Sequence, residues 1–211
     1  MDDIFIVAEH RQGEVLDVSK ELVSAGSELS ENAGANLHLV VIGGNTEPFA
    51  EELNLDGVDT IHTVEATDEF NHAVYVQSIV QLHQQLEPDV WMMPHSVTGL
   101  DYAPVVASEI DCPMVTDVIG FAGLQPLAVE RQLYGSKINA TVEIDRIPAL
   151  LTVRPNTWQP TETPGDSTVV SQEVPLDEER IRSQVTGYEE PEVGDVDLSE
   201  EDFIISIGRG I

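Results

Sequence analysis

Short runs that are apolar almost throughout recur along the first 118 residues, and stretches with helical spacing separate them. The apolar runs are Ile4–Ala8, Asn36–Ile42, Thr60–Val64, Val90–Met93 and Pro113–Val118. The stretches that we predict to be helices are Val15–Ala33, Thr46–Leu53, Asp68–Leu86 and Thr98–Ile110, the last regular only after Pro104. Strands that lack a polar face are buried on both sides, which is typical of parallel sheets. We therefore predict an α/β fold in which helices cover both faces of a parallel sheet.

After residue 119 the pattern changes to alternating, β-branched segments that are joined by short turns. These segments are Gly123–Tyr134, Lys137–Glu143 and Ile147–Arg154, and we expect them to add an antiparallel section to the sheet. We predict one more strand at Thr168–Val174 and a short charged helix at Asp177–Val185.

Residues 186–201 are acidic, contain proline and glycine, and lack apolar periodicity. This composition predicts a linker, which makes residues 1–185 one α/β domain. Residues 202–211 then begin a further unit, with a buried strand at Ile204–Ile207 and a turn at Gly208-Arg209-Gly210. A strand that runs into a glycine-rich turn commonly opens a nucleotide-binding βα unit.

The chain has 39 acidic and nine basic residues, which gives a formal charge of −30. The acids are spread from Asp2 to Asp202, and only Lys20 and Lys137 are lysines. Such a surface repels itself in dilute salt, whereas about 1 M salt screens charges within ~3 Å. We expect adaptation to a salt-rich cytoplasm, as in a halophile. Non-specific nucleic-acid binding is not expected, because phosphate contacts need clustered lysine and arginine.

No apolar run reaches the roughly 18 residues that span a bilayer, and the acidic start MDDIFIVAEH does not resemble a signal peptide. We therefore expect a cytoplasmic protein that is not itself embedded in the membrane. The single cysteine, Cys112, excludes an internal disulfide. The six histidines do not have the spacing of metal ligands, so no metal site is expected.

Two loops that follow predicted strands are candidates for binding a ligand. Gly43-Gly44-Asn45 precedes a helix, where backbone can approach a phosphate, but two glycines also commonly just end a strand. His95, Ser96 and Asp101 follow the fourth strand, at the edge where open α/β sheets bind ligands. A nucleophile elbow is missing there, so an α/β hydrolase cannot be assembled, and a polar loop with a helix cap is the simpler interpretation.

Basic residues concentrate in RQLYGSKINAT, which contains Arg131 and Lys137, and in LTVRP, which contains Arg154. Against so many acids they could form salt bridges. They could instead mark a contact surface for another subunit, since arginine is favoured at interfaces. For Tyr134, Trp91 and Trp158 we expect packing rather than stacking on a cofactor.

Four segments resemble the electron-transfer flavoprotein α subunit, in the order that the family has them. They are IFIVAEHRQGEV, LDYAPVVASEIDCPMVTDV, RQLYGSKINATVE with ALLTVRP, and DLSEEDFIISIGRGI. The resemblance covers nearly the whole chain. Two positions depart from it, because Val105 stands where many relatives carry arginine and Gln132 replaces a frequent proline.

The resemblance implies a Rossmann-like scaffold domain of the adenine-nucleotide-binding type, followed by an FAD domain that opens with Gly208, Arg209 and Gly210. These three residues are then expected to contact the flavin, and a β subunit that holds AMP is expected to complete a heterodimer. The family's FAD accepts electrons from dehydrogenases, such as the acyl-CoA dehydrogenases of fatty acid β-oxidation. It passes them to a membrane quinone reductase or another acceptor. The resemblance therefore implies an electron carrier and not a substrate-converting enzyme.

Residues 202–211 are expected to be the first strand and turn of an FAD domain whose remainder the sequence does not contain. We therefore expect this chain alone to bind FAD weakly or not at all. The alternative interpretation is a stand-alone adenine-nucleotide-binding module of the universal-stress-protein type, which would use the Gly43–Asn45 loop and the loop after the fourth strand.

Overall fold

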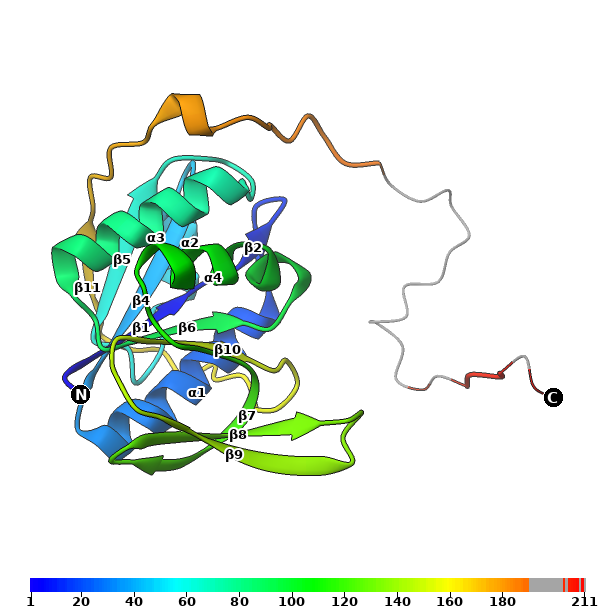
Figure 1. The fold of residues 1–211 in the computed structure, drawn as a ribbon. Helices are drawn as coiled ribbons and strands as arrows, with labels where there is room; N and C mark the ends of the chain where they lie inside the picture. The colour runs from blue at the N-terminus through cyan, green and yellow to red at the C-terminus, as the bar shows by residue number, and fades with distance from the viewer. Residues whose placement is uncertain (190–202, 204, 209, 211) are drawn as a thin grey trace.

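A computed structural model of the chain describes residues 1–189, 203, 205–208 and 210. Its centre is a nine-stranded sheet with the strand order β11-β5-β4-β1-β6-β10-β7-β8-β9 (Figure 1). The strands from β11 to β7 run parallel to one another, and β8 and β9 are added antiparallel. The strands are β1 (Asp3–Val7), β4 (Asn36–Gly43), β5 (Thr60–Glu65), β6 (Val90–Pro94), β7 (Met114–Leu124), β8 (Leu127–Leu133), β9 (Ile138–Ile144), β10 (Ala149–Val153) and β11 (Thr168–Ser171). The predicted α/β class is confirmed.

Helices cover both faces of the sheet, as the apolar strands require. The helices are α1 (Asp17–Ala33), α2 (Glu47–Glu52), α3 (His72–Leu86) and α4 (Val97–Glu109). In β1, Ile4 and Ile6 pack in the cluster that contains α1 and α2 residues, whereas Phe5 and Val7 pack in the cluster of α3 and α4. A small hairpin of β2 (His10–Arg11) and β3 (Glu14–Val15) lies between β1 and α1 in the chain. The core therefore has two apolar layers, one on each face.

The segment Ile147–Arg154 was predicted to join the antiparallel section, and this prediction is wrong. Its strand, β10, lies in the middle of the sheet and pairs parallel with both β6 and β7. All of the residues of β10 are buried, which fits a central parallel strand better than an alternating one. In the described part of the chain, the antiparallel addition consists of β8 and β9 together with the second half of β7.

Two helix starts differ from the prediction for local reasons. The helix α3 begins at His72 and not at Asp68, because the side chain of Asn71 accepts hydrogen bonds from the backbone amides of residues 73 and 74. The helix α4 begins at Val97 and continues through Pro104. Pro104 and Leu100 are both exposed, so the carbonyl that loses its partner can be hydrated.

The segment after β11 lies along α3 without forming the predicted helix at Asp177–Val185. Only one 3-10 turn forms there, η1 (Glu178–Arg180). The backbone groups of the segment bond instead to α3 and its cap: Gln77 Oε1 accepts from the Asp177 amide at 2.8 Å, and Asn71 Nδ2 donates to the Ser183 carbonyl at 2.7 Å. Figure 1 shows this segment passing α3 on its way toward the C-terminus.

The closing residues have little described structure. Most of the expected linker, residues 190–201, lies outside the described residues, as do Ile204 and Arg209. Of the expected strand at Ile204–Ile207, the described residues 205–207 are neither helix nor strand. Ile205 and Ile207 are 75% and 76% exposed, so these side chains contribute nothing to the core described here. The domain boundaries expected in this region stay a prediction.

A chain of hydrogen bonds crosses β1, β4 and β5 on the α3 face. Gln172 Nε2 donates to His62 Nδ1 at 2.9 Å, and His62 Nε2 lies 3.0 Å from His38 Nδ1. His38 Nε2 lies 3.2 Å from Asp3 Oδ1. Because a carboxylate only accepts and the amide nitrogen only donates, this chain is complete when both imidazoles are neutral and carry their proton on Nε2. Burial, together with the smaller effect of the nearby His38, lowers the pKa of His62 to about 4.

We expect the free energy of unfolding to fall as the pH drops from about 6.5 toward about 4, because the unfolded chain then binds a proton that folded His62 does not bind. The loss attributable to His62 is at most about 3.5 kcal/mol, since each pKa unit corresponds to about 1.4 kcal/mol. Denaturant unfolding of the wild type and of His62→Gln over this range measures it. The exposed His72→Gln serves as the control variant. An equally steep pH dependence in His62→Gln would show that another group is responsible.

Candidate functional site

The carboxyl ends of the parallel strands lie along one edge of the sheet. After β1, the next two strands of the sheet, β4 and β5, lie on one side of β1, and the following strand, β6, lies on its other side. The strand order therefore reverses between β1 and β6, which is where open α/β sheets bind ligands. Glu9 and His10 follow β1, and His95 and Ser96 follow β6.

Glu9 places a carboxyl group of the chain itself at this position. The residue is 3% exposed, and Ser96 Oγ donates to Glu9 Oε1 at 2.5 Å. The Glu9 backbone is held by Ser19, whose hydroxyl accepts from the Glu9 amide and donates to its carbonyl, both at 2.8 Å. Burial raises the pKa of Glu9, while hydrogen bonds from Ser96 and the Gly99 amide oppose the rise. Our sequence reasoning missed Glu9; a carboxylate directly after a buried strand was the available signal.

The three polar residues predicted near the end of the fourth strand do not converge. Ser96 caps α4 and contacts Glu9. Asp101 lies on the surface, where its Oδ2 is 3.0 Å from His72 Nδ1. His95 turns toward β10, with Nδ1 2.8 Å from Thr152 Oγ1. The simpler interpretation, a polar loop with a helix cap, is confirmed.

The glycines of the loop after β4 are explained by packing. A Cβ on Gly43 would lie 3.3 Å from the ring of Phe49 and 3.5 Å from His10 Nε2. A Cβ on Gly44 would collide with the carboxyl group of Asp68. The loop therefore needs glycine to let these side chains approach, and the nearest side chain to Gly44 is acidic. A carboxylate so close to the loop repels a phosphate, so the contacts do not support the phosphate interpretation.

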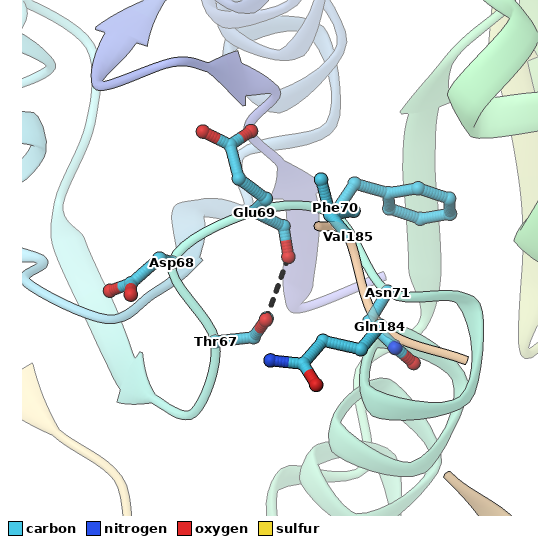
Figure 2. Close-up of a pocket in the computed structure, with 7 residues that line it drawn as sticks. All are labelled: Thr67, Asp68, Glu69, Phe70, Asn71, Gln184 and Val185. Carbon is cyan, nitrogen blue, oxygen red and sulfur yellow. Dashed lines mark hydrogen bonds between the residues drawn. The ribbon is translucent and has the colours of Figure 1, made fainter. Parts of the chain in front are cut away.

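Beside this loop, residues 67–71 and the C-terminal segment enclose a cavity of about 120 Å³ (Figure 2). This volume is below the roughly 300 Å³ that is the lower limit for typical small-molecule sites. One of the lining residues, Glu69, also accepts a hydrogen bond from the hydroxyl of Tyr188 at 2.5 Å, and the guanidinium of Arg11 lies 4.8 Å from the Tyr188 ring centroid. The described lining includes two carboxylates and no basic group, which does not suit a nucleotide. The lining residues are Thr67, Asp68, Glu69, Phe70, Asn71, Gln184 and Val185.

An ion pair joins β10 to the start of the antiparallel section. Arg154 Nε and Nη2 donate to Asp117 Oδ1 and Oδ2 at 2.7 and 2.6 Å, and Arg154 Nη1 donates to Gln132. The hydrogen bonds from Arg154 lower the pKa of Asp117. His95 Nε2 lies 3.9 Å from the same carboxylate. The salt-bridge interpretation is therefore confirmed for Arg154, and Gln132, which departs from the family pattern, has a structural contact.

The tip of the β8–β9 hairpin has a different character. Residues 131–140 include Arg131 and Lys137 and no acid, although the chain carries 39 acids. Tyr134 is 77% exposed and Ile138 51% exposed, so the prediction that Tyr134 packs inside the fold is wrong. Arg131 Nε is buried without a hydrogen-bond partner among the described residues. Figure 1 shows that this hairpin projects beyond the body of the sheet.

The expected flavin-contacting residues are not part of a formed site in the described chain. Gly208 and Gly210 are exposed, and no atom lies within 4 Å of a Cβ added to either. Arg209 lies outside the described residues. The described residues near this turn therefore do not by themselves form a pocket that could bind FAD.

The part of the chain that the structure describes indicates neither a reactive cysteine nor a metal site nor a membrane-spanning helix. The thiol of Cys112 is half-buried, and burial raises its pKa to about 11, so it is mostly protonated and unreactive at neutral pH. Among the described residues, no group of three or more acidic, histidine or cysteine side chains is arranged to hold a metal ion. None of the described helices is both long and apolar enough to cross a membrane.

Comparison with known proteins gives a consistent result. Residues 4–179 match the family described as "Electron transfer flavoprotein domain". The chain is 33% identical to the electron transfer flavoprotein subunit alpha of Methylophilus methylotrophus and 29% identical to that of Thermoanaerobacterium thermosaccharolyticum. It is 23% identical to the acryloyl-CoA reductase electron transfer subunit beta of Anaerotignum propionicum. These alignments cover 99–100% of the chain and 66% of each relative, so the chain spans slightly less than two thirds of their length.

Proposed function

The chain belongs to the electron transfer flavoprotein family, and from that premise we propose that it is the α/β scaffold of an electron-carrying α subunit. The family match over residues 4–179 supports this, because it covers almost the whole described fold. The α-subunit names of the relatives support it as well. In this role the protein carries electrons and does not itself convert a substrate.

We propose FAD as the carrier, with Gly208, Arg209 and Gly210 as its contacts in this chain. FAD supplies the redox chemistry when it is bound, and residues 1–185 supply a scaffold and a docking surface. No described atom lies within 4 Å of a Cβ added to Gly208 or Gly210, which supports a pocket whose other contacts lie outside the described residues. We also propose residues 186–201 as the linker between the scaffold and this flavin-binding region.

We propose a β subunit that holds AMP as the partner in a heterodimer. As electron donors we propose dehydrogenases that act on CoA esters, such as the acyl-CoA dehydrogenases of fatty acid β-oxidation. The name of the Anaerotignum propionicum relative, which concerns an acryloyl-CoA reductase, supports this class. As acceptor we propose a membrane quinone reductase or another redox protein. The charge of −30 supports a salt-rich cytoplasm as the location.

The surface that we propose to contact the β subunit is the hairpin tip, residues 131–140. It combines the exposed side chains of Tyr134 and Ile138 with two basic residues and no acid. Exposed aromatic and aliphatic side chains beside arginine are typical of interface centres. The tip also leads into β9, the edge strand of the sheet, whose outer backbone groups have no strand partner among the described residues. The chain as a whole is strongly acidic, so the tip is the part where an acidic partner meets least repulsion.

Ligand titration of residues 1–211 alone separates this proposal from the stand-alone nucleotide module. We expect FAD, AMP and ATP each to bind more weakly than about 100 µM, a free energy of binding smaller than about 5.5 kcal/mol. The reason is the acidic surroundings of the Gly43–Asn45 loop and the open surroundings of Gly208. Calorimetry in concentrated salt measures the binding. Micromolar binding of AMP or ATP would support the nucleotide module instead.

A further inference from the structure

A cavity of about 410 Å³ lies between α2 and the outer strands of the sheet. Its walls come from α2 with the residues that flank it, and from the carboxyl ends of β5 and β11. The volume lies within the range of about 300–1,000 Å³ that is typical of small-molecule sites. The residues that line this cavity, the α2 cavity, include Thr46, Glu47, Glu51, Thr63, Glu65 and Ser171.

The strand residues of the α2 cavity share one face of the sheet. In β5, Ile61 packs in the core cluster that contains α1 and α2 residues. Alternate residues of a strand point to the same face, so Thr63 and Glu65 also point to the α2 side. Ser171 of β11 pairs with Thr63 in parallel register and lies on the same face. The sheet therefore presents a row of polar side chains to the space beside α2.

Three carboxyl groups line the α2 cavity from two sides. Glu47 and Glu51 belong to α2, and Glu65 is the last residue of β5. The described lining contains no basic group. The ion pair that α2 forms with Lys20 uses Glu52, which does not line the cavity. Such a lining repels phosphates and carboxylates and favours a cation.

Two buried hydroxyl groups also reach the α2 cavity. Thr46 is 3% exposed and Thr63 is 6% exposed, and both line the cavity. Neither hydroxyl makes a hydrogen bond with a described residue, although Thr46 precedes α2 at the position where threonine often caps a helix. Neither oxygen is among the buried atoms that are closed off from solvent, so each is accessible from the cavity. Because buried polar groups are normally hydrogen-bonded, these hydroxyls need a ligand or water in the cavity.

The size of the α2 cavity and the groups around it select the class of cation. A bare metal ion is far smaller than about 410 Å³, and the described residues contain no group of three or more acidic, histidine or cysteine side chains arranged to hold one. An ammonium group instead donates three hydrogen bonds, which carboxylate and hydroxyl oxygens accept. Since carboxylates lie on two walls, a short chain with an ammonium group at each end can contact both.

We propose that the α2 cavity binds a small aliphatic diamine. One ammonium group lies beside Thr63 and Glu65, and the hydroxyl of Thr63 accepts one of its hydrogen bonds. The other ammonium group lies beside Glu47 and Glu51. The α2 cavity shares no residue with the hairpin tip or with the proposed flavin contacts, so this inference goes beyond the proposed function and does not depend on it.

NMR titration of the 211-residue chain with 1,4-diaminobutane tests the proposal. In about 0.5 M sodium chloride, which limits the reach of surface charge to about 4 Å, we expect one site with a Kd of about 1 mM. Thr63→Val keeps the shape of the side chain and removes the hydroxyl, so it should weaken binding by about 10-fold. Glu65→Gln should weaken binding by a similar factor, and because Glu65 is exposed this variant leaves the core intact.

Controls separate a built site from general attraction to an acidic chain. Glu14→Gln makes the same change of charge at an exposed position of β3, outside the cavity, and should bind the diamine within about two-fold of the wild type. 1-Aminobutane, which has one ammonium group, should bind about 10-fold more weakly than the diamine. Diamine binding that is equally tight in Thr63→Val, Glu65→Gln and Glu14→Gln would overturn the proposal. Magnesium chloride that shifts the same amide signals at equal or lower concentration would also overturn it.

Discussion

We expect Ile138→Asp to weaken the association with the proposed β subunit by about 100-fold, or about 2.7 kcal/mol. Ile138 is 51% exposed at the start of β9, beside the turn that carries Tyr134 and Lys137. The substitution puts a charge into the proposed centre of the contact and removes an apolar side chain from it. Tyr134→Ala should weaken the association by about 10-fold or more for the loss of a large aromatic contact. Calorimetric titration of the purified subunits measures both effects.

The opposite edge of the same sheet supplies the control. Val169 in β11 is 54% exposed, so Val169→Asp makes a similar change of size and charge at a similar exposure. We expect it to leave the association within about two-fold of the wild type, as is usual outside an interface centre. Circular dichroism should show all three variants folded, because each replaced side chain is exposed. Equal effects of Ile138→Asp and Val169→Asp would mean that the hairpin tip is not the contact.

We expect dilute salt to destabilise the protein strongly. Between about 1 M and about 0.1 M sodium chloride the screening length grows from ~3 Å to ~10 Å, so the −30 charge of the folded surface repels itself over longer distances. A loss of about 3 kcal/mol lowers the melting temperature by about 10 °C in a chain of this size. The described residues form few ion pairs that could offset this repulsion; two of them are Lys20 with Glu52 and Arg154 with Asp117. Thermal unfolding followed over a salt series measures the effect.

The shape of the salt dependence identifies its cause. Screening of surface charge should act mainly below about 0.5 M, because the screening length is already short above it. Exclusion of solute from the protein surface, which also stabilises proteins, continues to grow with concentration. Sucrose, which is excluded but uncharged, is the control and should not replace salt at low ionic strength. A melting temperature that rises with sucrose as much as with dilute sodium chloride would refute the electrostatic explanation.

Local patterns predicted most of the elements because their causes are local. Runs that are apolar almost throughout predicted β1, β4 and β6 to within a residue or two, since such runs are most stable when they are buried between two layers. Helix starts were less certain because side-chain caps decide them. At α3 the cap is Asn71, and the apolar pattern that predicted a start at Asp68 carries no information about this cap.

Strand pairing was harder to predict because it depends on residues far apart in the chain. The segment that forms β10 follows two antiparallel strands, and proximity in sequence favoured a third. Its buried sequence, Ala149–Val153, fits the gap between β6 and β7 instead, where both faces are covered. The short helix expected at Asp177–Val185 failed for a related reason, since contacts with α3 replace its internal hydrogen bonds.

The candidate site was predictable only in part. The sequence pointed to the loop after β6 and to a cap there, and Ser96 is that cap. It did not point to Glu9, because the partner of a buried carboxyl is known only once β1 and β6 are neighbours. Arg131 and Lys137 were visible as rare bases in an acidic chain, but the exposure of Tyr134 depends on how far the hairpin projects.

The visible absorption spectrum of the full-length α subunit that we propose, purified together with the proposed β subunit, tests the electron-carrier role most directly. We predict flavin bands that correspond to about one FAD for each heterodimer, and bleaching of these bands on anaerobic reduction. A colourless complex that neither contains nor takes up flavin would contradict the account.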